Sequence, residues 1–572
     1  MHTPNVTPRK SLYFDYKVYP FVRPPELDGR KKRHPVVVVG AGPVGLTAAL
    51  ELARYGVASV VLESECQVSE GSRAIVFTRR SLEILEQVGV GERVVENGLP
   101  WDSGNSFYRG QRVFRMESPT HPEARFPVMV NLQQPYLEAY LVDAVLREPL
   151  IELRWGSRVT GTVRNDDAVV VAVDTPEGEY QIESDYLVAA DGARSPIRQM
   201  LNARMEGSSY EGRFVIADIR IDLDLPTERL CYFDPEWNPG NTVLMHREPH
   251  KIWRIDYQLP AGESPEEALT ETSLRERIDA QLEMIGRGGT PWELDWASVY
   301  SARAMTLPKY VYGRIAFAGD AAHMLPIFGV RGANTGFQDA QNLAWKLAMV
   351  VKGRQAPELL DSYSTERVGA AREIIAEAGK STRFMTPPTH GYRLLRDATL
   401  SLALRHEFAR PLLHWRTSRA HDYVDSPINV PDDGAQFSAG PAQGSPALNV
   451  RIGDGAHLLD LLGGAFSLLV FSDVPLASDL QSALGKIRAA GLPVRVIRCL
   501  SGEAPVAAVA DVDRVIPDPD RRIATRYGVD GPFAAYLVRP DQHVSARWKH
   551  LDGARVLTAM SRMVSLNGEA RR

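Results

Sequence analysis

Apolar residues form short, closely spaced blocks near the start of the chain. Residues 36–39 are a run of valines, apolar positions then recur with helical spacing between Leu46 and Ala53, and a second strand-like run covers 59–62. Continuous β-branched runs of this length are typical of buried parallel strands, and the spacing between them predicts a helix. The pattern therefore predicts a strand–helix–strand unit, the building block of a doubly wound α/β sheet.

The pattern changes in the middle of the chain. Short alternating strands such as 214–221 and 252–259 are separated by Pro, Gly and acidic turns, which predicts an antiparallel sheet. Strand signal returns at 314–318 and is followed by helical patterns over 338–351 and 364–377. The first α/β unit is therefore predicted to be discontinuous.

A polar segment precedes the last part of the chain. Residues 424–446 are rich in Pro, Gly, Asp and Ser, which predicts a linker. Beyond Leu448, strand-like runs at 467–471, 494–498 and 535–539 alternate with helical patterns and predict a small α/β domain. This domain holds no C-x-x-C pair, so thiol redox activity is not expected of it.

Composition and charge exclude several classes of function. The chain has 572 residues, of which 44% are hydrophobic and 24% are charged, so it can bury several cores. Its 66 basic and 71 acidic residues give a formal net charge of -5, which leaves no global positive field for nucleic acid. Cys66, Cys231 and Cys499 are too scattered for a disulfide framework or a metal cluster. Neither nucleic acid nor a metal ion is an expected partner.

No targeting segment is apparent in the sequence. Residues 1–34 mix Tyr, Pro and charge, without the apolar core of a secretory signal. The most apolar stretch, 35–50, is interrupted by glycine and is shorter than the roughly 20 residues that span a bilayer. A cytoplasmic protein without membrane contact is therefore expected.

Three glycines follow the first predicted strand directly. Gly40, Gly42 and Gly45 form a G-x-G-x-x-G turn, and Glu63 ends the second strand. Glycine lets the backbone approach a pyrophosphate, the next helix start attracts its charge, and the carboxylate can accept hydrogen bonds from ribose hydroxyls. A tight turn without a ligand is the alternative. Because Glu63 stands where a ribose partner is needed, the pattern favours adenine dinucleotide binding.

Two further turns carry an aspartate at a strand end. Gly319 and Asp320 follow the strand at 314–318, and Asp191 and Gly192 follow another strand. Such an aspartate can accept hydrogen bonds from a polyol, and amides at the next helix start can stabilise a developing anion. A capping aspartate and an ordinary left-handed turn are the respective alternatives. Several glycine-rich turns together indicate one extended ligand.

The three turns together resemble the class A flavoprotein aromatic hydroxylases, the para-hydroxybenzoate hydroxylase and phenol hydroxylase superfamily of single-component FAD monooxygenases. The resemblance covers residues from about 35 to 385. It implies FAD as cofactor, NADPH or NADH as a transient reductant and O2 as co-substrate. In this chemistry a flavin C4a-hydroperoxide hydroxylates a phenolic or related aromatic ring, as in aromatic compound catabolism. The resemblance also implies a homodimer.

A fold class and domain layout follow from the resemblance. The fold is α/β, with a Rossmann-type FAD-binding domain, an antiparallel-sheet substrate domain and a C-terminal thioredoxin-like α/β domain. The expected boundaries are an N-terminal arm (1–34), a discontinuous FAD-binding domain (35–212 and 301–390), the substrate-binding sheet (213–300), a helical segment and linker (391–447) and the thioredoxin-like domain (448–572).

The resemblance assigns cofactor contacts by matching positions. Glu63 matches the ribose carboxylate, Arg73 an FAD-contacting arginine and Gln134 a glutamine close to the flavin. Arg331 lies where relatives carry a cation, which would favour the reduced anionic ring. Surface positions are the alternative for Arg73, Gln134 and Arg331. The full set of expected contacts is Gly40, Gly42, Pro43, Val44, Gly45, Glu63, Arg73, Gln134, Val159, Asp191, Gly319, Asp320, Pro326, Arg331, Gly332, Ala333 and Asn334.

Arg254 resembles a substrate-domain arginine that touches the flavin and helps it move between positions. A solvated strand arginine paired with Asp256 or Glu248 is the alternative, because strand alternation alone allows it.

The catalytic base is not where the family usually has it. The aspartate used by phenol hydroxylases aligns with Ile75, and the usual proline pair after the second turn is Pro326-Ile327. His titrates near neutrality and Tyr can relay a proton, so the central candidates are Tyr232, His246, Asp256 and Tyr257. The expected catalytic residues are Arg254, Tyr257 and His246.

Two other functions remain open from the sequence. A flavin halogenase shares much of this fold, but Trp292 and Trp296 do not match its W-x-W-x-I-P pattern. A flavin-binding sensor or scaffold without turnover would fit the unusual Ile75 and Ile327, with the C-terminal domain mediating assembly. Flavin turnover with any phenol would exclude the sensor.

Overall fold

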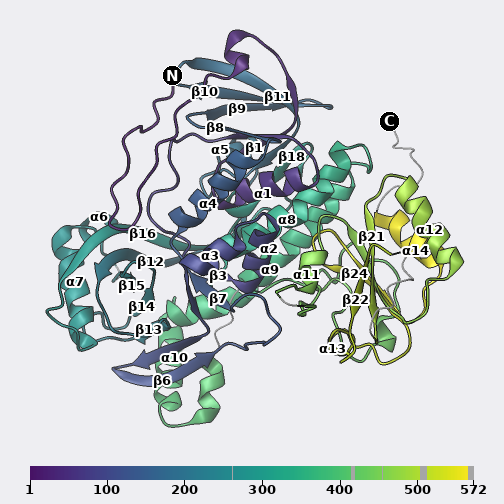
Figure 1. Cartoon of the computed structure of the whole chain (residues 1–572). Coiled ribbons are helices and arrows are strands. Elements are labelled where there is room, and N and C mark those ends of the chain that lie inside the picture. The colour runs from purple at the N-terminus through teal and green to yellow at the C-terminus, as the bar shows by residue number, and fades with distance from the viewer. Residues whose placement is uncertain (261, 327, 414–418, 454, 503–511, 564–572) are drawn as a thin grey trace.

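The computed structural model describes six stretches of the chain (Figure 1). They are residues 1–260, 262–326, 328–413, 419–453, 455–502 and 512–563.

The first sheet is the doubly wound unit that the sequence predicts. Its main path is β17-β18-β11-β1-β2-β8, and β9 and β10 extend it from β11. Strands β18, β11, β1 and β2 run parallel, so their carboxyl ends meet at one edge of the sheet. The strands are β1 (Arg33–Val39), β2 (Ser59–Leu62), β8 (Ile151–Arg154), β9 (Arg158–Arg164), β10 (Val169–Thr175), β11 (Gly178–Ala189), β17 (Val311–Tyr312) and β18 (Ile315–Phe317).

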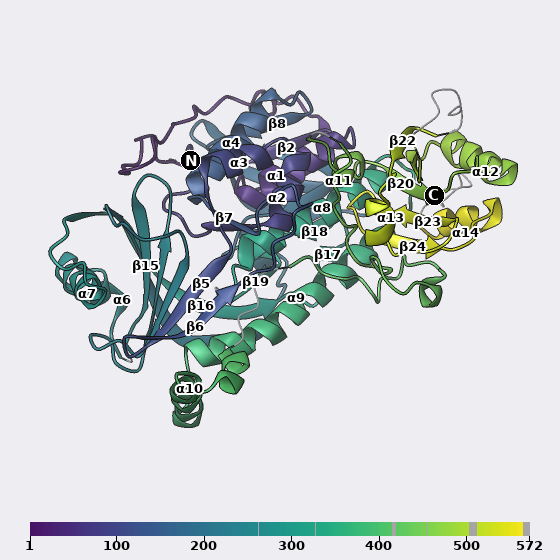
Figure 2. The same cartoon turned by 60° about the horizontal axis from the view of Figure 1, so that its bottom comes forward.

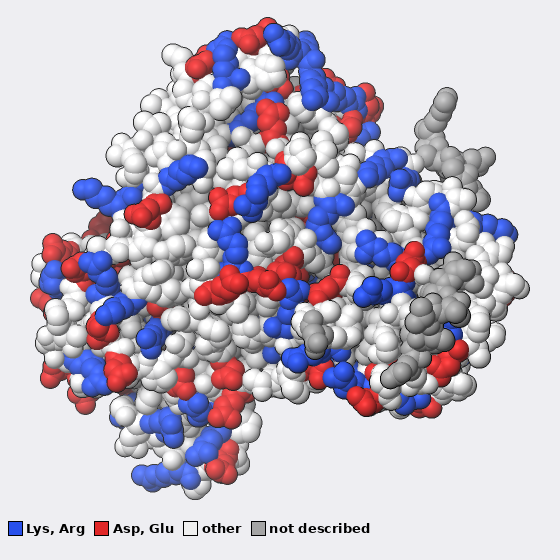
Figure 3. Space-filling model, viewed as in Figure 1, with Lys and Arg blue, Asp and Glu red and all other residues white. Residues whose placement is uncertain are grey.

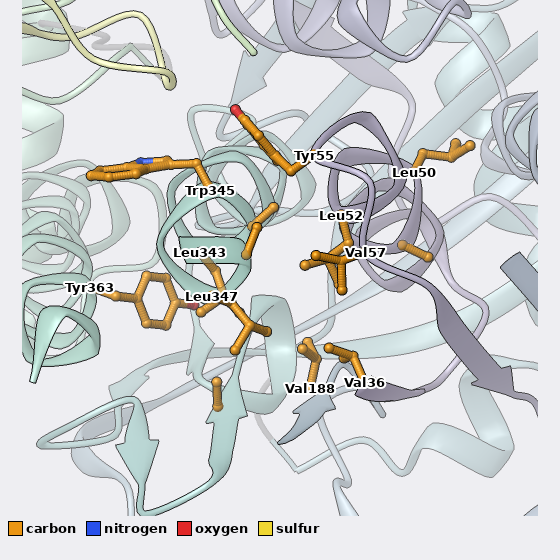
Figure 4. Packing of buried hydrophobic residues seen from close by; sticks show 14 of the residues in the cluster. Val36, Leu50, Leu52, Tyr55, Val57, Val188, Leu343, Trp345, Leu347 and Tyr363 are labelled. Carbon is orange, nitrogen blue, oxygen red and sulfur yellow. The ribbon is translucent and has the colours of Figure 1, made fainter. Parts of the chain in front are cut away.

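Two helices pack against each other over this sheet. They are α1 (Pro43–Arg54) and α8 (Gly332–Val351). Figure 4 shows Leu347 of α8 facing Leu52 of α1, above Val36 and Val188 of the sheet. Each buried aliphatic side chain of this size contributes about 1.5–3 kcal/mol. This packing fixes both helix N-termini close to the edge where the strands end.

An eight-stranded sheet forms the second body. Its order is β19-β16-β12-β15-β14-β13-β5-β6, antiparallel except between β13 and β5. Helices α6 (Pro265–Ala268) and α7 (Glu271–Met284) cover one face, as Figures 1 and 2 show. The strands are β5 (Ser103–Tyr108), β6 (Gln111–Glu117), β12 (Glu206–Ile221), β13 (Arg229–Phe233), β14 (Thr242–Arg247), β15 (Ile252–Gln258), β16 (Trp292–Thr306) and β19 (His323–Met324).

Two strands of this second sheet come from a distant part of the chain. The sequence-based boundary placed residues 35–212 in the FAD-binding domain and only 213–300 in the sheet. β5 and β6 lie within the former range, so that boundary is wrong in this respect. The pairing of β5 with β13 is long-range, and local alternation of apolar residues does not reveal it.

A small sheet and several helices complete these two bodies. The sheet has the order β3-β7-β4, with β3 (Val76–Thr78), β4 (Leu99–Trp101) and β7 (Met129–Asn131). The helices are α2 (Arg79–Gln87), α3 (Gly91–Asn97), α4 (Gln134–Arg147), α5 (Pro196–Met200), α9 (Leu359–Met385), α10 (His390–Ala403) and the short η1 (Pro25–Asp28), η2 (Gly319–Ala321), η3 (Glu407–Leu413) and η4 (Gly434–Gln436).

The C-terminal unit has a five-stranded sheet of its own. Its order is β22-β21-β20-β23-β24, with the first three strands parallel and the last two antiparallel. Figures 1 and 2 both place it beside α8 and away from α6 and α7. Its elements are α11 (Leu458–Leu461), β20 (Phe466–Phe471), α12 (Ser478–Ala489), β21 (Val494–Leu500), β22 (Arg514–Pro517), α13 (Arg522–Arg526), β23 (Ala534–Val538), β24 (Val544–Trp548) and α14 (Gly553–Met563).

Charges of both signs are interspersed over the face shown in Figure 3. Among the described residues, no helix is long and apolar enough to cross a bilayer.

Candidate active site

The glycine turn after β1 is shaped for close backbone approach. Gly40 has a φ of +103°, and a Cβ there would lie 2.5 Å from the carbonyl oxygen of Ala190. A Cβ on Gly45 would overlap the carbonyl oxygen of Gly40, so this position packs α1 onto the strand. A Cβ on Gly42, by contrast, would meet no described atom within 4 Å. The open side of the turn is therefore available to a ligand.

The start of α1 offers backbone donors at this open side. Pro43 is its first residue, and no side-chain hydrogen bond caps the helix at Gly42 among the described residues. Uncapped N–H groups and the helix dipole favour a phosphate. Glu63 lies beside the turn, because its carboxylate accepts a hydrogen bond from Ala41 N–H at 2.8 Å. This pair of features fits a dinucleotide pyrophosphate and its ribose.

The turn after β18 packs directly on the first turn. Cβ atoms on Gly319 and Gly336 would both crowd Val44, the second residue of α1. The amide of Gly319 donates to Asp339 of α8 at 3.0 Å. The structure thus brings together two turns that lie far apart in the sequence.

Asp320, next in the chain, points to a solvent-accessible space rather than into the core. Its side chain is exposed, yet surrounding protein raises the pKa of its carboxyl group. The charges of His323, Arg73 and Arg198 oppose that rise. The carboxylate can accept hydrogen bonds from a polyol chain, as predicted for the ribityl part of FAD.

Asp191 lies two residues beyond the end of β11, at the same edge. One carboxylate oxygen accepts from Ile197 N–H at 3.1 Å, and the other is buried without a partner among the described residues. Burial raises the pKa of this carboxyl group. Arg198, which the sequence analysis did not identify, donates to the carbonyl oxygen of Ala321 at 3.0 Å and so ties this loop to the Asp320 turn.

The N-terminus of α8 closes the site from another side. Its first residues are Gly332, Ala333 and Asn334, and no side-chain hydrogen bond caps the helix at Arg331 in the described part of the chain. The Asn334 side chain is occupied by protein, since it accepts from Thr78 N–H at 2.9 Å. Any contact of Asn334 with the flavin would therefore use its backbone amide.

Two other expected contacts, Pro326 and Val159, and the unusual Ile327 are placed as follows. Pro326 is buried in the loop before α8, and Ile327 lies outside the described residues. Val159 of β9 belongs to the main hydrophobic core.

Arg73 lies in a loop that joins the cofactor turns to the substrate sheet. Its side chain is exposed and acts electrostatically on Asp320. Gln134 holds this loop, because its side-chain oxygen accepts from Ala74 N–H at 3.0 Å and its amide nitrogen donates to Glu138 at 2.7 Å. Direct contacts of Arg73 and Gln134 with the flavin remain predictions.

Arg254 is not solvated, so the alternative is wrong about its exposure, although the pairing with Glu248 that it named is present at 3.6 Å. It is 2% exposed, and Nε and Nη2 each lie 2.8 Å from an oxygen of Asp218. It also donates to the backbone carbonyl oxygens of Ser72 and Arg73. The guanidinium therefore holds the backbone of the Arg73 loop in place through hydrogen bonds. Its predicted contact with the flavin itself stays untested.

Asp218 was missed by the sequence analysis, although antiparallel pairing could have found it. It faces Arg254 directly in the register of β12 and β15. Glu248 lies 3.6 Å from Arg254, and burial together with Asp218 holds the pKa of Glu248 well above its usual value. Arg254 is thus the cation that pairs with both buried carboxyl groups, Asp218 and Glu248.

Tyr257 is removed from the candidate catalytic residues by its place in β15. Tyr257 lies with Trp253 and Ile255 in the cluster that α6 and α7 cover, as does Tyr232 of β13. Alternate residues of a strand point to opposite faces, so Arg254 and Asp256 lie on the other face.

The face opposite α6 and α7 is turned towards the cofactor loops. Phe214 of this face meets Phe328, from the loop before α8, with ring centroids 5.4 Å apart. Asp256 lies between Ile216 and Leu244 in the register of this sheet. The described residues thus form an apolar wall with a carboxyl group in it.

Asp256 and His246 are the titratable candidates on this face. One oxygen of Asp256 is buried, and its carboxylate accepts no hydrogen bond from any residue that the structure describes. Burial raises the pKa of Asp256 to about 7, although Arg254 and Arg229 oppose the rise. Burial, with the charges of Arg229 and Arg254, lowers the pKa of His246 to about 3. His246 is therefore neutral and a weak base near pH 7.

Comparisons with known proteins agree with this arrangement of turns. A family model described as "FAD binding domain" matches residues 33–378. A 3-(3-hydroxy-phenyl)propionate/3-hydroxycinnamic acid hydroxylase of Burkholderia vietnamiensis is 30% identical over 537 residues, covering 90% of this chain and 94% of the relative. The chain belongs to the FAD-dependent aromatic hydroxylases. An enzyme of the same name from Escherichia coli is 27% identical over 516 residues, covering 89% and 91% of the two chains.

Solved structures of flavoenzymes share the fold across more than nine tenths of the hydroxylase chain. Aklavinone-11 hydroxylase, in a ternary complex with FAD and aklavinone, has a TM-score of 0.74 and 25% identity, covering 94% of this chain and 100% of that one. The flavin-dependent monooxygenase PieE, with FAD and substrate, has a TM-score of 0.77 at 23% identity, covering 93% and 99%.

Family membership confirms the predicted function class. The chain is a flavin-dependent aromatic hydroxylase with FAD as cofactor, and the family typically consumes NADH or NADPH. The residues present fit FAD: an open glycine turn, uncapped helix starts and a buried, unpartnered oxygen on Asp191 converge at one sheet edge.

Replacing Gly42 by Ala is expected to weaken FAD binding without unfolding the apoprotein. The added methyl group has room in the protein but stands where a pyrophosphate would approach. A crowding cost of about 1–3 kcal/mol corresponds to roughly a 5- to 150-fold weaker affinity. Flavin fluorescence during titration of apoprotein measures this, with Gly485→Ala in α12 as the control, because a Cβ there also meets no described atom within 4 Å. Equal affinity for the Gly42 variant would contradict the assignment.

Proposed function

We propose that this hydroxylase acts on a phenol and that Asp256 accepts the proton of the phenolic hydroxyl. The observation that carries the proposal is the unpartnered Asp256 carboxyl group, set in an apolar wall on the face turned towards the cofactor loops. A buried base with a pKa close to neutrality is well matched to a phenol, because it is ionised at working pH and still basic.

Bound FAD, reduced by NADH or NADPH, supplies the activation of O2. The chain's own residues prepare the ring for that step. Asp256 takes up the hydroxyl proton, so that the ring becomes electron-rich. Phe214, Leu244 and Phe328 exclude water around it, which protects a reactive cofactor from side reactions. Ile75 takes no part in proton transfer and belongs to a small apolar cluster with Trp101.

The substrate class follows from the relatives and from one buried cation. Two relatives bear the name of hydroxylases for 3-(3-hydroxy-phenyl)propionate and 3-hydroxycinnamic acid. Arg229 is buried on the strand next to His246, and its charge acts on Asp256. A single-ring phenol with a short acidic side chain suits this combination, with the carboxylate near Arg229.

A panel of ring compounds tests this proposal. NADH and NADPH oxidation, O2 uptake and product mass are measured with hydroxyphenyl acids, their methyl ethers and their carboxamides. The free phenols are expected to give a product one oxygen atom heavier, whereas the ethers, which have no hydroxyl proton, give none. The carboxamides are expected to raise KM about tenfold or more through loss of a charged contact. Hydroxylation of the ethers at the phenol rate would overturn the role of the base.

The remaining sequence-based expectations are part of the same proposal. The C-terminal unit is a thioredoxin-like domain without redox activity, since its one cysteine, Cys499, is buried. The enzyme is cytoplasmic and forms a homodimer.

A further inference from the structure

Residues 1–24, the part of the predicted N-terminal arm (1–34) that precedes η1, join the FAD-binding domain to the substrate sheet and are called the arm below. The arm starts at β10, where the backbone N–H of His2 donates to Asp174 at 2.9 Å. It then reaches β16, where the backbone N–H of Leu12 donates to Asp295. Figure 1 shows this purple segment running from the β9–β10 region towards β16 and back. The arm therefore crosses the junction at which the cofactor loops lie.

Between these anchors the arm binds the loop that follows β2. Arg9 Nη1 donates to the carbonyl oxygen of Val68 at 2.6 Å. The Gln67 side chain accepts from Arg9 N–H at 3.0 Å and donates to the carbonyl oxygen of Thr7 at 2.7 Å. Residues 67 and 68 are thus tied to the arm through both Arg9 and the Gln67 side chain.

Tyr16 contacts the loop two residues before Arg73. Its buried hydroxyl donates to the carbonyl oxygen of Ser69 and accepts from the N–H of Gly71, each at 3.2 Å. Gly71 has a φ of +69°, and the ring of Trp296 occupies the place that a Cβ would take. The loop is therefore clamped between a tyrosine of the arm and a tryptophan of β16.

The next three residues of the same loop, 72–74, are held by β15 and α4 rather than by the arm. Arg254 donates to the carbonyl oxygens of Ser72 and Arg73, and Gln134 accepts from Ala74 N–H. The arm therefore binds the loop up to Gly71, and Arg254 and Gln134 bind it from Ser72 to Ala74, so Arg73 lies just beyond the contacts of the arm.

We infer that the N-terminal arm positions Arg73 for FAD, with Tyr16 as the positioning residue. The Arg73 side chain is long and exposed, so its place depends on the backbone that carries it. Exposed loops without such ties sample many conformations, and a loop that is already ordered binds its ligand at a lower entropic cost. This inference goes beyond the hydroxylation of phenols and does not depend on the substrate.

The variant Tyr16→Phe tests the inference, because it removes only the hydroxyl. Tyr19→Phe is the matched control: Tyr19 lies on the same arm with the same 8% exposure, and its hydroxyl makes no hydrogen bond with the described residues. Two measurements are made on each protein: amide hydrogen exchange of peptides covering residues 67–74, and the FAD dissociation constant of the apoprotein by fluorescence.

Tyr16→Phe is expected to speed exchange of the Gly71 amide and to raise the FAD dissociation constant, each roughly five- to tenfold, as a net loss of about 1–1.4 kcal/mol from its two long hydrogen bonds predicts. Tyr19→Phe is expected to leave both unchanged. The inference is overturned if Tyr16→Phe leaves FAD affinity unchanged, whether or not the protein melts earlier. It is also overturned if both variants weaken FAD equally, because the arm would then act only through general stability.

Discussion

Replacing Asp256 by Asn is expected to slow ring hydroxylation by about 10²–10⁴-fold, the usual contribution of a positioned general base. Asn has nearly the same shape but cannot accept the phenolic proton. FAD binding is expected to survive, because Asp256 lies in the substrate sheet and away from the glycine turns. The measurement is product formed per turnover against NADH or NADPH oxidised. An unchanged rate of hydroxylation would contradict the role of Asp256.

The pH dependence separates a base from a residue that only shapes the site. In the native enzyme, hydroxylation is expected to rise as pH passes through about 7, where Asp256 ionises. The Asn variant should lose this rise. Asp224→Asn, at an exposed position of the same domain, is the control and should keep it. If His246→Gln removes the rise and Asp256→Asn does not, the base is His246 instead.

Stability is expected to move in the opposite direction from activity. The pKa of Asp256 is higher in the folded chain than the value of about 3.9 in an unfolded one. Its contribution to stability is therefore present at acid pH and is lost as pH rises through about 7. Above that pH, Asp256→Asn should raise Tm, measured by thermal unfolding with FAD bound. A group kept at a cost to stability is typical of an active site.

The cofactor half of the site could be predicted from sequence because its signals are local. The valine run, the glycine turn and Glu63 follow one another closely, and parallel strands bring their carboxyl ends to one edge by rule. Strand β2 has the predicted limits, 59–62. The joining of β5 to β13 could not be predicted, because register between distant strands leaves no local pattern.

The catalytic half could not be predicted because it depends on which face of a strand meets the cofactor. Alternation in β15 separates Arg254 and Asp256 from Tyr257, but the sequence does not say which set faces the helices. The structure shows Tyr257 on the helix-covered face. The partner of Arg254 was missed for a related reason, since Asp218 belongs to the neighbouring strand. Side chains that meet only because two strands pair cannot be predicted until the register of those strands is known.

Arg539→Met is expected to lower the free energy of unfolding by about 3–5 kcal/mol, the cost of breaking a buried ion pair from one side. Arg539 is 1% exposed, and its guanidinium lies 2.7 Å from Glu366 of α9 and also pairs with Asp541. These contacts dock the C-terminal unit onto the FAD-binding domain. Losing the arginine leaves two buried carboxylates close together, with Lys346 still bound to Glu366 at 2.6 Å.

The pH dependence of unfolding shows whether Arg539→Met loses stability because two buried carboxylates are left without their cation, or only because packing contacts are lost. Arg539 holds the pKa values of Glu366 and Asp541 below their usual range, so the native pair stabilises the fold above the unfolded pKa values and less as pH falls. The loss in the free energy of unfolding caused by Arg539→Met, measured by denaturant unfolding, should therefore become smaller towards pH 4. At pH 7, adding the second substitution Asp541→Asn should recover part of this loss. Arg522→Met is the control, since Arg522 is about half exposed and its pair with Glu123 is long at 3.7 Å. A loss as small as that of the control would mean that the C-terminal unit docks mainly through apolar packing around Trp345 and Phe466, whose rings meet edge to face at 5.7 Å.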